Sequence, residues 1–234
     1  MMPNRASPAI AVVIGASGGI GTALAEMVEE SGHFRQVVRL SRASQPRIDI
    51  EDEQTIRQAS SHVASRGVPT LIINATGFLH GDGFEPEKTW RSLDPKHLAK
   101  SFAVNATGPA LVMKHFLPLL AKSERAVFAT LSARVGSIGD NRLGGWYGYR
   151  AAKAALNQFV RTAAIELGRS NRAAICVALH PGTVDTELSA PFGKAGLAVQ
   201  APRDAAAAIL SCLDKLTPRD SGGFFDRTGD QLPW

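Results

Sequence analysis

The chain has 234 residues, of which 44% are hydrophobic and 20% are charged, with a mean hydropathy of −0.03. These values are typical of a globular protein and exclude a largely disordered or membrane-embedded chain. A single α/β domain can reach about 250 residues, so we expect one domain over 1–234. The net charge is +5, but Lys and Arg form no block, which argues against nucleic acid as a partner.

Two cysteines, Cys176 and Cys212, lie in apolar stretches without a Cys-x-x-Cys or His cluster nearby. This usage favours a reduced, cytoplasmic protein without a disulfide or metal site. No apolar run approaches the roughly 18 residues of a membrane span, so we also expect no membrane partner.

The first predicted strand is the apolar run Ala9 to Ile14, which leads directly into a glycine-rich turn and an amphipathic helix. Glycines let the backbone approach a pyrophosphate, whose charge then meets the N-terminus of the helix. Gly15, Gly19 and Gly21 have the spacing Gly-x-x-x-Gly-x-Gly. Between a strand and a helix, this spacing predicts dinucleotide binding rather than a purely structural turn. The expected contacts are Gly15, Ser17, Gly18, Gly19, Ile20 and Gly21.

The second predicted strand, Gln36 to Leu40, is followed by Arg42. An arginine at this place accommodates a ribose 2′-phosphate, so Arg42 predicts NADP(H) over NAD(H), against the alternative of a solvated side chain. The run Arg47 to Ile50 is counted as the third strand, and a helix follows over 52–66. Asp49, with Ile50, is expected near the adenine, although Asp49 could equally cap the helix.

A fourth strand over 68–73 ends at Asn74, Ala75, Thr76 and Gly77. Parallel α/β sheets bind ligands at the carboxyl ends of their strands, so these four residues are expected at the cofactor. A long helix is predicted over 98–120, with Phe102 facing inward, and Asn105, Gly108 and Pro109 interrupt it. The interruption indicates either a functional kink or, slightly favoured, a helix boundary.

The fifth strand, 126–131, ends at Ser132, and a glycine-rich loop leads to a helix that carries Tyr149 and Lys153 and ends at Gly168. Residues four apart share one helix face. A charge about 4 Å from a phenolate is worth about 4 kcal/mol at a dielectric of about 20, roughly three pKa units. Such a tyrosine exchanges protons near neutral pH, although the spacing alone also fits a surface pair.

The sixth strand, 173–179, is followed by His180, which we interpret as structural rather than catalytic. A polar segment over 187–200 fits either a mobile lid or a surface loop. A helix over 202–216 and a short strand over 223–226 complete the chain. The alternation predicts an α/β fold: a single Rossmann-type doubly wound domain, with a parallel sheet of about seven strands and helices on both faces.

These motifs together resemble the classical short-chain dehydrogenases/reductases over essentially the whole chain. The resemblance implies that Tyr149 is the general acid/base, that Lys153 tunes it and binds the nicotinamide ribose, that Ser132 orients the carbonyl, and that Asn105 holds a relay water. It also implies nicotinamide contacts from Pro181, Gly182, Thr183, Val184 and Thr186. The expected activity is NADP(H)-dependent oxidoreduction of a small carbonyl or alcohol by a homodimer or homotetramer.

The chain departs from the family pattern at Ile14, usually Thr, and at Ala75, usually Asn. A strict alignment also places Ala133 in the serine position, so Ser132 is the first choice for that role and Ser137 the reserve. Residues 132–138, 144–147 and 222–226 are similar to the C-factor subgroup. The alternative function is therefore a cofactor-binding signalling or sensor protein with little turnover.

Overall fold

A computed structural model describes residues 9–81, 83–190 and 198–234 of the protein. Its strands are β1 (Ile10–Ile14), β2 (Gln36–Leu40), β3 (Pro69–Asn74), β4 (Ala126–Leu131), β5 (Ala174–His180), β6 (Thr183–Val184), β7 (Val199–Gln200) and β8 (Phe224–Asp226). Its α-helices are α1 (Gly19–Glu30), α2 (Glu53–Arg66), α3 (Pro95–Phe102), α4 (Gly108–Phe116), α5 (Tyr147–Ser170) and α6 (Pro202–Lys215). Short helical turns are η1 (Trp90–Ser92), η2 (Ala103–Thr107), η3 (Leu117–Leu119), η4 (Arg134–Gly136) and η5 (Pro218–Asp220).

The main sheet has six parallel strands in the order β2-β1-β3-β4-β5-β8, and β6 pairs with β7 separately. The doubly wound prediction is confirmed. The predicted third strand, Arg47 to Ile50, is absent from this sheet, which accounts for six strands instead of about seven. Its backbone N–H groups bond elsewhere, from Ile48 to Ser41 and from Asp49 to the Thr55 hydroxyl.

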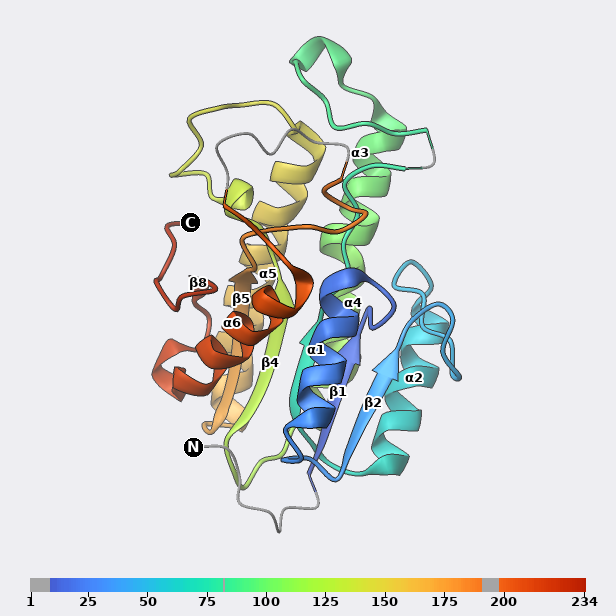
Figure 1. The fold of residues 1–234 in the computed structure, drawn as a ribbon, viewed down its shortest axis with the longest axis vertical. Coiled ribbons are helices and arrows are strands. Elements are labelled where there is room, and N and C mark those ends of the chain that lie inside the picture. Colours follow the sequence, from blue (N-terminus) through green and yellow to red (C-terminus); the bar gives the residue numbers. More distant parts are fainter. Residues whose placement is uncertain (1–8, 82, 191–197) are drawn as a thin grey trace.

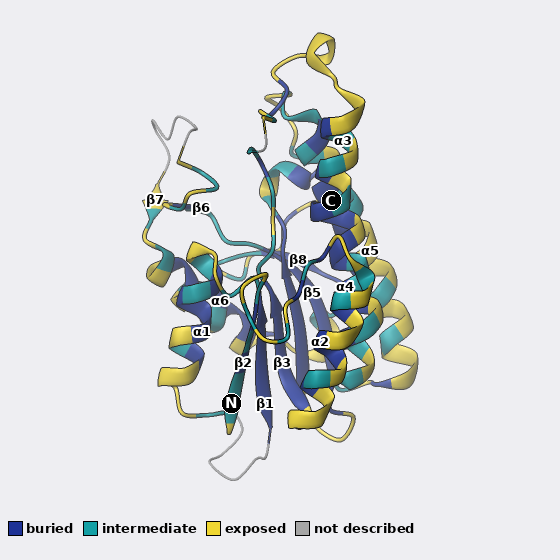
Figure 2. Ribbon diagram, turned by 90° about the vertical axis from the view of Figure 1, so that its right-hand side faces the viewer, coloured by how far each residue is buried: buried dark blue, intermediate teal, exposed yellow. Residues whose placement is uncertain are grey.

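Two helical layers enclose the sheet, as Figures 1 and 2 show. Helices α2, α4 and α5 pack on one face, where Ile56, Val112 and Leu156 are fully buried. Helices α1 and α6 cover the other face through Leu24 and Ile209. Every residue of β1, β3 and β4 is buried. This explains why their sequences are continuous apolar runs rather than alternating ones.

The long helix before β4 continues through its interruption, so the favoured helix boundary was wrong. Residues Ala103–Thr107 form a π-helical turn between α3 and α4. The extra residue in such a turn rotates the apolar stripe, which explains why Phe102 is 37% exposed although it was predicted to face inward. Helix α5 also runs past Gly168, whose position leaves open space where a side chain would stand.

The segment between β6 and β7 was predicted to be either a lid or a surface loop, and residues 191–197 of it lie outside the described residues. The flanking strands are placed, because β6 pairs with β7 through Thr183 with Val199 and Val184 with Gln200. Among the described residues, no helix combines the length and apolar character needed to cross a membrane.

Candidate active site

The glycine-rich turn lies between the ends of β1 and β2. Gly15 has a φ of +82°, and the N–H groups of Gly15 and Ala16 both donate to the carbonyl of Leu40. A Cβ added at Gly21 would stand 2.1 Å from the Gly15 carbonyl oxygen. The turn is therefore closed by backbone packing that only glycine permits at position 21.

The N-terminus of α1 is open to an anion. Its N-cap is Gly18, and within the described chain no side chain caps the helix and no acidic residue lies in its first turn. The first N–H groups of a helix lack intrahelical partners and favour negative charge. The pyrophosphate of a dinucleotide therefore fits this end of the helix, next to the predicted contacts Ser17, Gly19 and Ile20.

The residues after β3 adjoin the same turn. Asn74 is fully buried, where its amide donates to the Thr130 hydroxyl at 3.1 Å and its carbonyl oxygen accepts from the Thr76 hydroxyl at 2.8 Å. A Cβ at Gly15 would lie 3.0 Å from the Ala75 backbone. Asn74, Ala75 and Thr76 therefore line the space beside the glycine turn, as predicted from the strand end.

The residues expected at the adenine and its ribose lie beyond β2. Arg42 is exposed and lies two residues after the end of β2. The carbonyl of Leu40, the last residue of β2, accepts hydrogen bonds from the glycine turn. Asp49 pairs with Arg47 at 2.7 Å. The N-cap of α2 is Asp52, whose carboxylate accepts from the N–H of Gln54, so the capping alternative for Asp49 was wrong. The carbonyl of Ile50 packs against Gly108, where a Cβ would stand 2.7 Å from it.

Asn105 lies in the π-helical turn and fastens the segment after β3. Its side chain accepts from the N–H of Phe78 at 3.0 Å and donates to the carbonyl of Phe78 at 2.7 Å. A Cβ at Gly77 would stand 3.7 Å from the Asn105 amide oxygen and 4.0 Å from Lys153 Nζ. Asn105, Gly77 and Lys153 therefore meet at one point, and π-turns are frequent at functional sites.

Tyr149 and Lys153 lie one turn apart on α5, as the spacing predicts. Lys153 is 2% exposed, its Nζ donates to the carbonyl of Leu131 at 2.9 Å, and this nitrogen lies 5.7 Å from the centre of the Tyr149 ring. A Cβ at Gly136 would stand 2.7 Å from Lys153 Cβ. The glycine of η4 thus lets the chain after β4 close over the lysine.

Burial disfavours the charged form of both groups. It raises the pKa of the half-buried Tyr149 phenol above its ordinary value and lowers the pKa of Lys153 to about 7. Both shifts oppose the predicted lowering of the tyrosine pKa. An anion beside Lys153 would raise its pKa again, because opposite charges stabilise one another in a site that excludes water.

The serine of the predicted set does not fit its role. Ser132 is 3% exposed, and its hydroxyl donates to the Asn157 side chain at 2.7 Å. Asn157 is buried and lies eight residues after Tyr149 on α5, about 12 Å along the helix axis, so the partner of the Ser132 hydroxyl is away from the first turn of this helix. The reserve, Ser137, is also buried, and its hydroxyl accepts from the N–H of Asp140. Neither contact brings a serine hydroxyl to Tyr149.

The loop after β5 returns to the glycine turn. Gly182 has a φ of +83°, Thr183 and Val184 form β6, and a Cβ at Gly19 would stand 2.7 Å from the Thr186 side chain. This contact brings Thr186, at the end of the segment expected at the nicotinamide, to the start of α1. The adjacent His180 has its pKa lowered to about 4, mainly by burial, and is therefore neutral at pH 7.

Two further residues contact the first turn of α5: Trp146, from the glycine-rich loop, and Glu87, which the sequence reasoning missed. The ring of Trp146, which has a φ of +52°, packs against the Tyr149 ring at 6.3 Å and 73°. Backbone in this region is strained for a non-glycine residue, and such strain is common at active sites. Glu87 accepts a hydrogen bond from the N–H of Gly148. The two glycines before Trp146 were the only local signal for a special conformation there.

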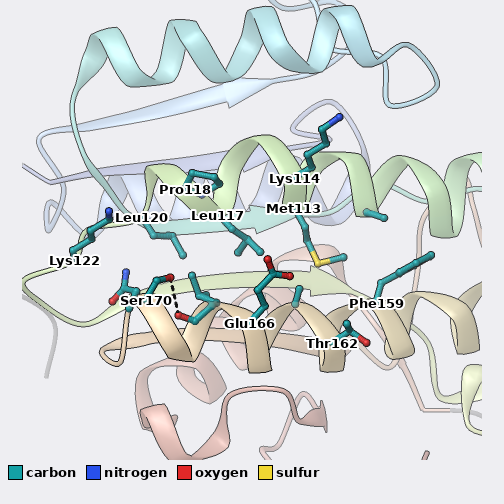
Figure 3. A pocket seen from close by; sticks show the side chains of 14 residues that line it. Met113, Lys114, Leu117, Pro118, Leu120, Lys122, Phe159, Thr162, Glu166 and Ser170 are labelled. Atoms are coloured by element: carbon teal, nitrogen blue, oxygen red, sulfur yellow. Dashed lines mark hydrogen bonds between the residues drawn. The ribbon is translucent and has the colours of Figure 1, made fainter.

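A groove between α4 and α5 lies elsewhere in the molecule. Its volume is about 430 Å³. Figure 3 shows side chains that line it, among them Met113, Leu117, Phe159 and Glu166. On α5 its lining starts at Phe159, nearly three turns beyond Tyr149. This groove is therefore separate from the convergence of the glycine turn, Gly77 and Lys153.

The comparison with known families decides the class of the protein. Residues 9–195 match the model of the short chain dehydrogenase family. The chain belongs to this family. Similar characterised proteins include C-signal from Myxococcus xanthus, 37% identical over 142 residues that cover 61% of this chain and 81% of the relative. A 1-hydroxy-2-glutathionyl-2-methyl-3-butene dehydrogenase from Rhodococcus sp. is 27% identical, covering 95% of this chain and 98% of the relative.

Solved structures of short-chain dehydrogenases superpose closely on this one. An NADPH-bound carbonyl reductase from chicken fatty liver has a TM-score of 0.84 at 24% identity, covering 97% of this chain and 99% of that one. A short chain dehydrogenase from Burkholderia cenocepacia in complex with NADP has a TM-score of 0.75 at 26% identity, covering 90% and 86%. The predicted membership in the family is thus confirmed, as is the Rossmann-type fold.

Proposed function

We propose that the protein is an NADP(H)-dependent oxidoreductase that interconverts a small carbonyl compound and its alcohol, with Tyr149 as the proton donor and acceptor. The observation that carries this proposal is the placement of Lys153 Nζ, 5.7 Å from the centre of the Tyr149 ring and 4.0 Å from a Cβ built at Gly77. The lysine nitrogen thereby lies between the Tyr149 ring and Gly77. Gly77 follows β3 at the same edge of the sheet as the glycine turn.

When bound, NADP(H) supplies or accepts the hydride. Tyr149 donates a proton to the carbonyl oxygen during reduction and takes one from the alcohol during oxidation. Lys153 stabilises the phenolate that forms, because its ammonium is held beside the ring in a buried site. Since both serines are turned elsewhere, the phenol is the hydroxyl that we assign to the substrate oxygen.

Asn105 is proposed to hold a relay water that returns protons to the pair through Lys153. Support comes from its position in the π-helical turn and from its side-chain oxygen, which lies 3.7 Å from a Cβ at Gly77. The two hydrogen bonds to Phe78 hold Asn105 in one orientation. Water bound at such a fixed position exchanges protons with buried groups at little cost in entropy.

The preference for NADP(H) is proposed from Arg42, which is exposed just beyond the strand end that bonds the glycine turn. The remaining proposed cofactor contacts are Asp49 and Ile50 at the adenine, Asn74 to Gly77 beside the glycine turn, and Pro181 to Thr186 at the nicotinamide. Several similar solved structures hold NADP or NADPH.

Replacing Arg42 with Asp is expected to reverse this preference. The carboxylate repels a 2′-phosphate and accepts from a 2′-hydroxyl, so the Kd for NADPH should rise about tenfold to hundredfold while that for NADH falls. Titration calorimetry with both cofactors measures the change. The matched control is Arg57→Asp, which alters the charge equally at an exposed position on α2. An unchanged preference in Arg42→Asp would exclude the assignment.

The function itself is tested by incubating the purified protein with NADPH and a panel of aldehydes and ketones. Saturable oxidation of NADPH by at least one carbonyl compound is the expected result. A cofactor that binds but is not consumed by any of them would instead favour the signalling or sensor alternative, which the similarity to C-signal raises. Cytoplasmic location and assembly into a homodimer or homotetramer remain predictions.

A further inference from the structure

A buried carboxylate meets the first turn of α5. Glu87 is 3% exposed, and its Oε2 accepts from the N–H of Gly148 at 3.1 Å. The backbone carbonyl of Glu87 accepts from the N–H of Trp146. Both donors belong to the turn that carries Tyr149, so Glu87 holds this turn at two points.

Helix α5 has no capping group of its own in the described structure. Its N-cap is Trp146, whose side chain makes no cap hydrogen bond, and the first turn contains no acidic residue. The free N–H groups at a helix start require acceptors, and a negative charge there is favourable. Glu87 supplies both from a segment 61 residues away.

The other carboxylate oxygen of Glu87 connects this turn to α3. Oε1 lies 3.3 Å from His97 Nδ1, and His97 is 4% exposed. Oε1 has no hydrogen-bond partner in the described chain, so its contact with His97 is a close approach of carboxylate and imidazole rather than a hydrogen bond. Burying a carboxylate oxygen without a partner is costly, and His97 Nδ1 is the polar group placed beside it.

His97 is itself fixed by aromatic packing. Its ring stacks on Phe84 at 5.2 Å and 12° and meets the edge of Phe78 at 6.3 Å and 82°. Phe78 is the residue whose backbone Asn105 holds with two hydrogen bonds.

We propose that Glu87, supported by His97, is the positioning residue of this site: it fixes the first turn of α5 and so sets the direction of the Tyr149 phenol relative to Asn105. Without Glu87, the first turn of α5 would follow a strained N-cap residue, Trp146, and would have no side-chain acceptor, so this turn would fray. The expected effect of Glu87 on turnover rests on the proposed function. The effect of Glu87 on the orientation of Tyr149 is measurable without turnover.

The direct test uses the two tyrosines of the chain, Tyr147 and Tyr149. Protein labelled with ¹³C at tyrosine Cζ gives two NMR signals, which Tyr147→Phe assigns. In Glu87→Ala the Tyr149 signal should shift and broaden, whereas Glu87→Gln, which keeps an oxygen for Gly148, should show a smaller change. The matched control is Val160→Ala, which opens a cavity on the same helix three turns away. It should leave the Tyr149 signal in place.

Turnover supplies the second reading. With a carbonyl substrate found in the panel, kcat per folded molecule should fall about tenfold to hundredfold in Glu87→Ala and less in Glu87→Gln, with the Kd for NADPH within about twofold. If Glu87→Ala does not fold, Glu87→Gln and His97→Asn carry the test. An unmoved Tyr149 signal in folded Glu87→Ala overturns the inference, and where that variant does not fold, an unmoved signal in both Glu87→Gln and His97→Asn does so. Absence of turnover in the wild type overturns only the proposed function, because the NMR result still decides the positioning.

Discussion

The Tyr149→Phe protein is expected to bind NADPH with the wild-type Kd. Its kcat for a carbonyl substrate should be about 100-fold to 10,000-fold lower. Removing the phenol oxygen removes the proposed proton donor, and general acid/base catalysis contributes about that factor. Because the ring packs against Trp146 and lies beside Lys153, the phenylalanine ring should occupy the same place. Calorimetry for NADPH and steady-state rates with a carbonyl substrate measure the two quantities.

The chain offers a matched control one half-turn away. Tyr147→Phe removes the same atom from a half-buried tyrosine in the same helical turn. This variant should retain kcat within about threefold, because no contact places Tyr147 beside Lys153. Comparable losses in both variants, or full activity in Tyr149→Phe, would mean that proton transfer does not pass through Tyr149.

The second large effect is expected from Gly21→Ala. The added Cβ would stand 2.1 Å from the Gly15 carbonyl oxygen and 2.8 Å from its carbonyl carbon, so the backbone of the turn must move. Overpacking of this kind costs about 1–3 kcal/mol, which lowers Tm by about 2–10 °C in a domain of this size. The Kd for NADPH should rise at least tenfold, because the displaced N–H groups are those proposed to bind the pyrophosphate.

Gly168→Ala separates this steric effect from the general consequence of adding a methyl group to a helix. Nothing lies within 4 Å of a Cβ at Gly168 in α5. The substitution should stabilise the protein by about 0.5–1 kcal/mol, since alanine is the better helix former, and leave NADPH binding unchanged. Wild-type affinity for NADPH in Gly21→Ala would show that the glycine turn is not the cofactor site.

Local patterns in the sequence predicted the parts of the site that depend on short spacing. The glycine turn between β1 and α1 and the pairing of Tyr149 with Lys153 both follow from periodicity and strand ends within a few residues. The carboxyl ends of β1 and β3 also meet as predicted, because Ile14 pairs with Asn74 in the register of a parallel sheet.

Long-range contacts account for what the sequence did not predict. Whether Ser132 faces Tyr149 depends on Asn157, which offers its hydroxyl a buried partner two turns away. The role of Glu87 depends on Gly148, and no local pattern joins positions 61 residues apart. Phe102 was wrongly assigned to the buried face of the helix before β4. That assignment assumed a constant period of 3.6 residues, which does not reveal a π-turn.

The central claim is that this site passes a hydride between NADP(H) and a carbonyl carbon while Tyr149 handles the proton. It is tested most directly by following the hydride in the panel assay, with NADPH that carries deuterium at C4 on each face in turn. Mass spectrometry of the product alcohol should find one deuterium on the carbinol carbon with one of the two labelled cofactors. Consumption of NADPH that leaves both product samples unlabelled would contradict the account.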